Sequence, residues 1–181
     1  MDEHQAINLL RNGDSSGMEV LVNQYYLQAV RSSFIIVQDQ SMAEDIVQEA
    51  FIKVMNKIYQ LKSDRFKPWF FKIIINDSIR GAIKQKRIVP LDDHEYEITR
   101  NLAEWLIDKN PSVEEQFETK ELHLQIIKAL GFLTPQQRAI IVLRYYLEYS
   151  EFELEYELKI PRSTIKWRLY SAREKLRELL H

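Results

Sequence analysis

Apolar residues recur at intervals of three and four through most of this chain, and helix-breaking residues seldom interrupt them. This spacing is typical of amphipathic α-helices, in which one face is buried and the other is solvated. Only four glycines and five prolines occur among the 181 residues, so long helices can continue without a break. The pattern therefore predicts an all-α fold.

The predicted helices fall into two groups, and the dipeptide Val89-Pro90 ends the first of them. Ser41 is the expected N-cap of one helix, with Glu44 at its capping-box position. The helices are expected over residues 18–26, 29–37, 41–58, 68–86 and 112–131, followed by a terminal helical set. We predict an N-terminal helical domain over 1–88, an acidic linker over 89–111 and a C-terminal domain over 112–181.

One stretch departs from the helical spacing. Apolar and acidic residues alternate from Ser150 to Leu158, and a period of two is typical of a β-strand. No neighbouring segment offers a pairing strand, and glutamate and leucine are good helix formers. We therefore predict a helix here as well.

The last third of the chain predicts a compact two-helix unit of the kind that reads DNA. Ile160-Pro161 breaks the chain between two helices, and Ser163 or Thr164 can cap the second. This second helix is apolar on one side and cationic on the other, which suits the major groove of DNA. Its cations are Lys166, Arg168, Arg173, Lys175 and Arg177.

A second basic block, from Lys62 to Arg87, carries aromatic side chains among its cations. The formal net charge of −2 argues weakly against DNA binding, but an acidic stretch separates the two basic blocks. Each block can therefore present its own phosphate-facing surface. A single basic block is more often an ordinary solvated surface, whereas two blocks with interleaved aromatics favour nucleic acid.

A third candidate surface is a polar stripe at helical spacing, formed by Asp45, Gln48, Glu49 and Lys53. Ile46, Val47 and Phe51 are expected to face inward beneath it. A polar stripe over a well-packed face can bind another protein. The alternative is a solvated helix face stabilised by internal Glu–Lys pairs.

Three segments, in this order, resemble the bacterial sigma factors of the extracytoplasmic-function (ECF) group. Residues 43–54 resemble the polymerase-binding helix of that family, and residues 66–73 with Asn76 and 84–87 are similar to its −10 segment. The C-terminal helix-turn-helix, ending at residues 172–180, is similar to its −35 reader. The resemblance implies two helical domains, a linker between them and a role in transcription initiation.

The resemblance also implies specific roles for the residues of the three segments. Core RNA polymerase would be bound by Asp45, Gln48, Glu49, Phe51 and Lys53. The melted −10 strand would be held by Lys62, Ser63, Arg65, Phe66, Trp69, Lys72, Asn76, Arg80, Lys84, Lys86 and Arg87. Duplex −35 DNA would be read by Arg144, Arg162, Ser163, Thr164, Lys166, Trp167, Arg168 and Arg173. An anti-sigma factor is left open as a further partner.

The chain departs from the family in the helix-turn-helix. Glu155 stands where the family has a small residue facing the second helix, and Glu157 replaces an aliphatic residue. Lys159 replaces a glycine in the turn, and Trp167 replaces a small residue. An unpaired buried glutamate would cost several kcal/mol. We therefore expect either that the helix rotates or that Glu155 pairs with a cation such as Arg168.

Other classes of function find little support in the sequence. The chain has no cysteine, its four histidines are scattered, and it contains no His-Glu-x-x-His or glycine-rich phosphate motif. We expect no catalytic site, metal, cofactor or small-molecule substrate. The acidic start and short apolar runs predict a cytoplasmic protein without membrane insertion.

Two other functions remain open. The main alternative is a helix-turn-helix regulator that binds duplex DNA as a dimer and carries a helical sensor domain. A helical adaptor that has lost DNA binding is a further one.

Overall fold

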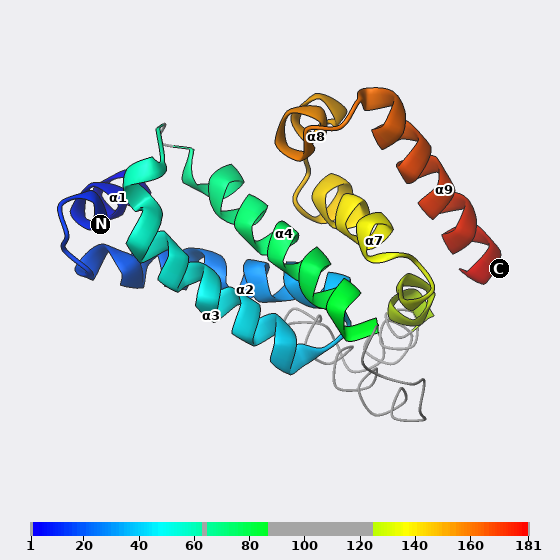
Figure 1. Ribbon diagram of the computed structural model, residues 1–181, viewed down its shortest axis with the longest axis horizontal. Helices are drawn as coiled ribbons and strands as arrows, with labels where there is room; N and C mark the ends of the chain where they lie inside the picture. The colour runs from blue at the N-terminus through cyan, green and yellow to red at the C-terminus, as the bar shows by residue number, and fades with distance from the viewer. Residues whose placement is uncertain (1, 63–64, 87–124, 181) are drawn as a thin grey trace, which may run out of the picture. The chain divides into compact units, whose positions relative to one another are not determined.

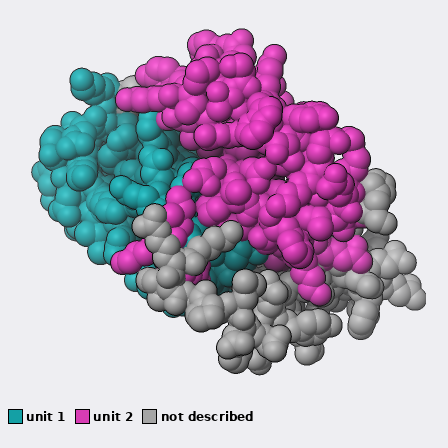
Figure 2. Space-filling view, turned by 45° about the vertical axis from the view of Figure 1, so that its right-hand side comes forward, with its two compact units in different colours: residues 1–82 teal, residues 83–181 magenta. Residues whose placement is uncertain are grey.

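The computed structural model describes residues 2–62, 65–86 and 125–180, and every regular element in these ranges is helical (Figure 1). The predicted all-α fold is confirmed. The chain divides into two compact units, residues 1–82 and 83–181 (Figure 2). The predicted linker, residues 89–111, lies outside the described residues, so the three-part domain division stays a prediction.

The described residues of the first unit form four α-helices and one short 3-10 helix, and the last of these helices continues past residue 82. They are α1 (Glu3–Arg11), α2 (Ser16–Val37), α3 (Gln40–Lys57), η1 (Ile58–Gln60) and α4 (Phe66–Lys86). Helix α2 packs along α3, and α1 packs on α2 and η1. Sequence periodicity missed α1, whose Asp2 and Gln5 form a capping box. It also divided α2, which is one helix of 22 residues.

The start of α3 differs from the prediction. Asp39, not Ser41, is the N-cap: its backbone is extended and its carboxylate accepts a hydrogen bond of 2.7 Å from the Met42 N–H. Ser41 lies within the first turn. The difference arises because α2 ends at Gln38 in the left-handed conformation, which brings the chain into α3 two residues earlier.

An aromatic cluster forms the centre of this unit and holds α4 against α2 and α3. Phe70 lies between Phe66, at 5.4 Å between ring centroids, and Phe51 of α3, at 4.7 Å. The ring centroid of Tyr25 in α2 lies within 6.2 Å of the ring centroids of Phe66, Phe70 and Phe71. Aromatic pairs at these separations add to the stabilisation from apolar burial. The cluster therefore fixes the position of α4.

Two polar or close contacts also fix the packing in this unit. Ser33 of α2 and Ser78 of α4 share a buried hydrogen bond of 2.8 Å between their hydroxyls. Helix α1 crosses α2 at Gly17, where a Cβ would lie 2.2 Å from the carbonyl oxygen of Ala6. A glycine is therefore required at this crossing.

The described part of the second unit contains a short helix over residues 125–131, three further α-helices and a π-helical turn. They are α7 (Pro135–Ile141), η2 (Val142–Tyr146), α8 (Glu151–Leu158) and α9 (Arg162–Leu180). Helix α9 packs on α7 and α8 (Figure 1). The helix predicted for the alternating stretch is confirmed as α8, and Ser150 caps it together with Glu153.

The turn between α8 and α9 accommodates Lys159 where the family has a glycine. Lys159 adopts the left-handed conformation at φ 54° that a glycine would adopt more easily, and its N–H donates to the Glu155 carbonyl. The prediction that Ser163 or Thr164 caps α9 is wrong. The helix begins at Arg162, so both residues lie in its first turn. The break at Ile160-Pro161 is confirmed.

Arg138 of α7 is a buried cation at the core of the second unit. Its Nη1 donates to the carbonyls of Leu133 at 2.9 Å, Gly131 at 3.4 Å and Leu130 at 3.5 Å. Burial lowers the pKa of Arg138 to about 10, so it stays charged at neutral pH. The guanidinium thereby ties the end of the 125–131 helix to the start of α7.

Candidate functional site

The exposed face of α3 is both polar and apolar. Asp45, Gln48 and Glu49 are exposed, as the sequence predicts. Ile52 and Met55 continue this face and are 58% and 51% exposed, and Tyr59 follows them at 72%. Sequence reasoning missed these apolar residues, although their spacing from Gln48 follows the same helical period. A helix face that combines polar residues with exposed apolar side chains is typical of protein-binding faces.

Two of the residues predicted to bind polymerase or DNA lie in the core. Phe51 is 7% exposed and packs on Phe70, and Phe66 is fully buried beside Tyr25. Their rings therefore support the α3 and α4 surfaces from beneath and are not available to polymerase or to DNA bases. The sequence itself had placed Phe51 on the inward side of its helix.

Lys53 connects the α3 surface to α4. Its Nζ lies 2.7 Å from the Asp77 carboxylate and 3.8 Å from that of Glu49. Asp77 also bonds Arg80, one turn further along α4. Burial raises the pKa of Asp77, but the hydrogen bonds from Lys53 and Arg80 outweigh burial, so the pKa lies below its ordinary value.

One face of α4 gathers four of the residues predicted for the −10 strand. Trp69, Lys72, Asn76 and Arg80 follow one another at intervals of three and four, so they lie on the same side of the helix. Asn76 and Lys84 are exposed, whereas Trp69 and Lys72 are partly buried. The Trp69 ring lies 6.0 Å from that of Phe66. This face combines an aromatic ring, cations and an amide.

The ends of this predicted site are described only in part. Lys62 and Arg65 are exposed in the segment before α4, and Lys86 is the last residue of α4. Ser63 and Arg87 lie outside the described residues. The part that Ser63 and Arg87 would play in holding the −10 strand therefore stays a prediction.

The exposed face of α9 carries two large aromatic residues among polar ones. Trp167 is 67% exposed and Tyr170, one turn further, is 59% exposed. Ser163, Lys166 and Arg173 are exposed on this helix, whereas Thr164 and Arg168 are partly buried. Sequence reasoning missed Tyr170, although it lies three residues after Trp167. Ile165, Leu169 and Ala172 are buried, which confirms the predicted apolar side of this helix.

The acidic helix α8 pairs with the cations of α9. Glu155 bonds Arg162 at 3.1 Å and also accepts a hydrogen bond of 3.3 Å from the Arg162 backbone N–H. Glu151 lies 3.8 Å from Lys166. The expected pairing of Glu155 with a cation is confirmed, but its partner is Arg162 and not Arg168. Glu157 is partly buried on the same helix.

Arg144 has a contact within its own unit. Its Nη1 donates to the Tyr149 carbonyl at 3.0 Å and so holds the turn between η2 and α8. Because Arg144 is partly buried, only part of the guanidinium can reach another molecule. A role for Arg144 in DNA binding stays a prediction.

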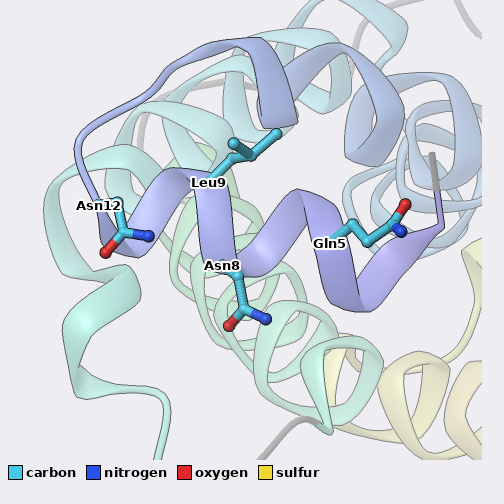
Figure 3. Close-up of a pocket in the computed structure, with 4 residues that line it drawn as sticks. All are labelled: Gln5, Asn8, Leu9 and Asn12. Carbon is cyan, nitrogen blue, oxygen red and sulfur yellow. The ribbon is translucent and has the colours of Figure 1, made fainter.

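The described residues contain no group of three His, Asp or Glu side chains placed to hold a metal ion. A shallow hollow on α1 is lined by Gln5, Asn8, Leu9 and Asn12, none of which is ionisable (Figure 3). No helix in the described part of the chain is long and apolar enough to cross a membrane.

Two sequence families match the chain, one in each half. Sigma-70 region 2 matches residues 21–88, which include most of α2 and all of α3 and α4. Sigma-70 region 4 matches residues 123–176, which include α7, α8 and most of α9. The two surfaces of the first unit and the surface of α9 therefore lie within the matched regions.

Similar proteins and structures agree with these matches. The ECF RNA polymerase sigma factor SigW of Bacillus subtilis is 29% identical over 177 residues, which cover 96% of this chain and 94% of SigW. SigV of the same organism is 28% identical over 148 residues, which cover 81% of each chain.

Two solved structures share the fold. CnrH in complex with the cytosolic domain of CnrY has a TM-score of 0.68 at 19% identity, with coverage of 98% of this chain and 96% of CnrH. RpoE of Bartonella quintana in complex with the anti-sigma factor NepR has a TM-score of 0.61 at 23% identity, with coverage of 90% and 97%. The chain therefore belongs to the sigma-70 family of RNA polymerase sigma factors, within its ECF group.

Proposed function

We propose that this sigma factor holds core RNA polymerase and the melted −10 strand with its first unit and reads duplex −35 DNA with its second. As a sigma factor it directs promoter-specific initiation by core RNA polymerase, and its class is that of non-enzymatic initiation factors. The observation that carries the division of labour is the different chemistry of α4 and α9. A regulator that binds only duplex DNA would have no need of the α4 face.

The α3 face is the proposed contact with core RNA polymerase. Asp45, Gln48 and Glu49 supply charge and hydrogen bonds, and Ile52 and Met55 supply apolar area. Interfaces of this mixed kind depend on a few apolar contacts surrounded by polar ones. Lys53 contributes through its ion pair with Asp77, which holds α3 in register with α4.

Charge reversal tests this contact. The variant Asp45→Lys/Glu49→Lys should bind core polymerase at least tenfold more weakly while keeping its helical content. Glu19→Lys, at an exposed position of α2, is the matched control. Unchanged affinity of the double variant would remove α3 from the interface.

The α4 face is the proposed holder of the melted −10 strand. Single-stranded nucleic acid is bound by aromatic rings that stack on bases and by cations that follow the backbone. Trp69 can stack, Lys72 and Arg80 can bind phosphates, and the exposed Asn76 amide can pair with the edge of an extruded base. Lys62, Arg65 and Lys84 extend the cationic surface at both ends.

The exposed face of α9 is the proposed −35 reader. An α-helix fits the major groove, where arginine and lysine bond guanine edges and apolar groups contact the thymine methyl. Lys166 and Trp167 lie near the start of α9, and Arg173 follows towards the C-terminal end. Residues near the start of the helix are suited to bases and the later cations to phosphates.

Run-off transcription with core polymerase tests the division between the two units. Asn76→Ala should impair open-complex formation on duplex promoters, and a premelted −10 bubble should restore part of the loss. Lys166→Ala should weaken promoter binding by about 1–3 kcal/mol, and the bubble should not restore it. Asn23→Ala, at an exposed position of α2, is the control. The same response of both variants to the bubble would refute the assignment.

We further propose that the protein acts in the cytoplasm, where core polymerase is found, and that it has an anti-sigma partner. CnrH is bound to the cytosolic domain of CnrY, and RpoE to the anti-sigma factor NepR. The exposed Ile52, Met55 and Tyr59 offer apolar area for such a partner. Competition between that partner and core polymerase for this protein would support the proposal.

A further inference from the structure

Two acidic residues of α8 face two of the proposed DNA-binding cations of α9. Glu151 and Glu155 are one turn apart on α8, and Arg162 and Lys166 are one turn apart on α9. They pair as Glu155–Arg162 at 3.1 Å and Glu151–Lys166 at 3.8 Å. We call these four residues the carboxylate ladder. It places two negative charges beside the surface that would face a polyanion.

The ladder holds Arg162 in one orientation. Glu155 binds both the guanidinium and the backbone N–H of Arg162, and the guanidinium carbon lies 5.8 Å from the centre of the Phe152 ring. A carboxylate on one side and an aromatic face on another limit the rotamers of this long side chain. Because a guanidinium has five N–H donors, others remain available for a base edge.

The pairs are exposed enough to respond to DNA. The side chains of Arg162 and Glu155 are 46% and 41% exposed, and those of Lys166 and Glu151 are 62% and 39% exposed. Ion pairs at such positions are weak, so a well-placed partner can replace them. A phosphate that approaches either cation, however, also meets the neighbouring carboxylate, and like charges repel.

We propose that Glu151 and Glu155 determine specificity at the −35 surface by keeping Arg162 and Lys166 away from phosphates. This inference rests on the proposed function of α9. Non-specific DNA binding arises almost entirely from cations on phosphates, whereas base edges carry the sequence information. Two carboxylates that oppose phosphate contacts but leave guanidinium donors free for bases therefore lower non-specific binding more than specific binding.

The test replaces both carboxylates by amides of the same shape. Full-length Glu151→Gln/Glu155→Gln and the unaltered protein are each assembled with core polymerase and bound to duplexes that contain a random segment. Enrichment of the selected −35 sequence over the bulk pool measures specificity. Glu178→Gln is the control away from the ladder, at an exposed position near the end of α9. It removes one negative charge, whereas the double variant removes two.

The double variant should bind the unselected pool roughly 3- to 30-fold more tightly and enrich the −35 sequence less. The slope of log affinity against log salt should steepen by about 1–2, because two cations become free for phosphates. Equal enrichment by both proteins, or an unchanged salt slope, would overturn the proposal. If the double variant loses helical content, the single variant Glu151→Gln is compared with the unaltered protein in the same assay. It retains both contacts of Glu155 with Arg162.

The same experiment separates this inference from the function on which it rests. If the unaltered protein enriches no sequence, the proposed −35 reading fails and the ladder proposal fails with it. If the unaltered protein enriches a sequence and the double variant enriches it equally, only the ladder proposal fails.

Discussion

Lys53 Nζ on α3 lies 2.7 Å from the Asp77 carboxylate on α4, so one ion pair connects the proposed polymerase surface with the proposed −10 surface. The Asp77 side chain is 11% exposed, which keeps water from screening the pair fully. Arg80, on the −10 face, bonds the same carboxylate. Binding at either surface can therefore affect the other through Asp77.

Asp77→Asn should destabilise the first unit and weaken both of its proposed activities. The amide would remove the carboxylate charge that Lys53 and Arg80 share and leave Lys53 only its longer contact with Glu49. The cost should be about 1–2 kcal/mol, because hydrogen bonds between charged groups contribute more to stability than neutral ones. Urea unfolding at neutral pH measures this cost. Glu49→Gln, which removes only the longer contact to Lys53, should have a much smaller effect.

Stability should fall in acid because of the same carboxylate. The pKa of Asp77 is lower in the folded protein than its ordinary value of 3.8, so the folded state holds the proton less tightly. The stabilisation is complete above this ordinary value and is lost as the pH falls through the lower folded pKa. Urea unfolding from pH 7 to pH 3 should therefore show a smaller loss for Asp77→Asn than for the unaltered protein.

Gly17→Ala should be among the most damaging single methyl additions in the first unit. The new Cβ would meet the Ala6 carbonyl oxygen at 2.2 Å, and neither backbone can move without displacing α1 from α2. Overpacking of this kind costs roughly 1–3 kcal/mol. Gly81→Ala is the control, because its Cβ would meet only side-chain ends, Met42 Sδ at 3.2 Å and Ile46 Cδ1 at 3.4 Å, and no backbone atom. Thermal unfolding of the two variants should differ clearly.

Arg138→Met should destabilise the second unit by roughly 2–3 kcal/mol, because hydrogen bonds to charged groups are the stronger kind. The thioether would fill part of the space but leave three carbonyls without their donor. Hydrogen exchange at the amides of α7 should accelerate. Arg173→Met, at an exposed position of α9, should leave that exchange unchanged.

The helical class and most helices could be predicted from the sequence, because a helix with one buried face has apolar residues at intervals of three and four. The ends of the helices were harder to predict. Helix α1 has only nine residues, of which Ala6, Ile7 and Leu10 are buried, and so few apolar positions give little periodicity. The start of α3 depends on the left-handed conformation of Gln38 before it. The residue types in the sequence do not indicate this conformation.

The sequence predicts which residues share one face of a helix, but not which residues of two different helices pair with each other. Spacing on one helix places Asn76 beside Lys72 without further information. The partner of Glu155 depends instead on how α8 crosses α9, and the sequence offered Arg168 where the crossing brings Arg162. The exposed Tyr170 and Ile52 could have been found from spacing alone, but apolar residues are usually assigned to a core.

Arg138 also limits where the second unit can be separated from the rest of the chain. A fragment that begins at Thr134, just before α7, would keep the guanidinium and lose all three carbonyls that accept from it. Each lost acceptor removes a hydrogen bond to a charged group, and such bonds contribute more to stability than neutral ones. A fragment that keeps all three contacts must therefore begin at or before Leu130, although the helix-turn-helix itself begins well after that residue.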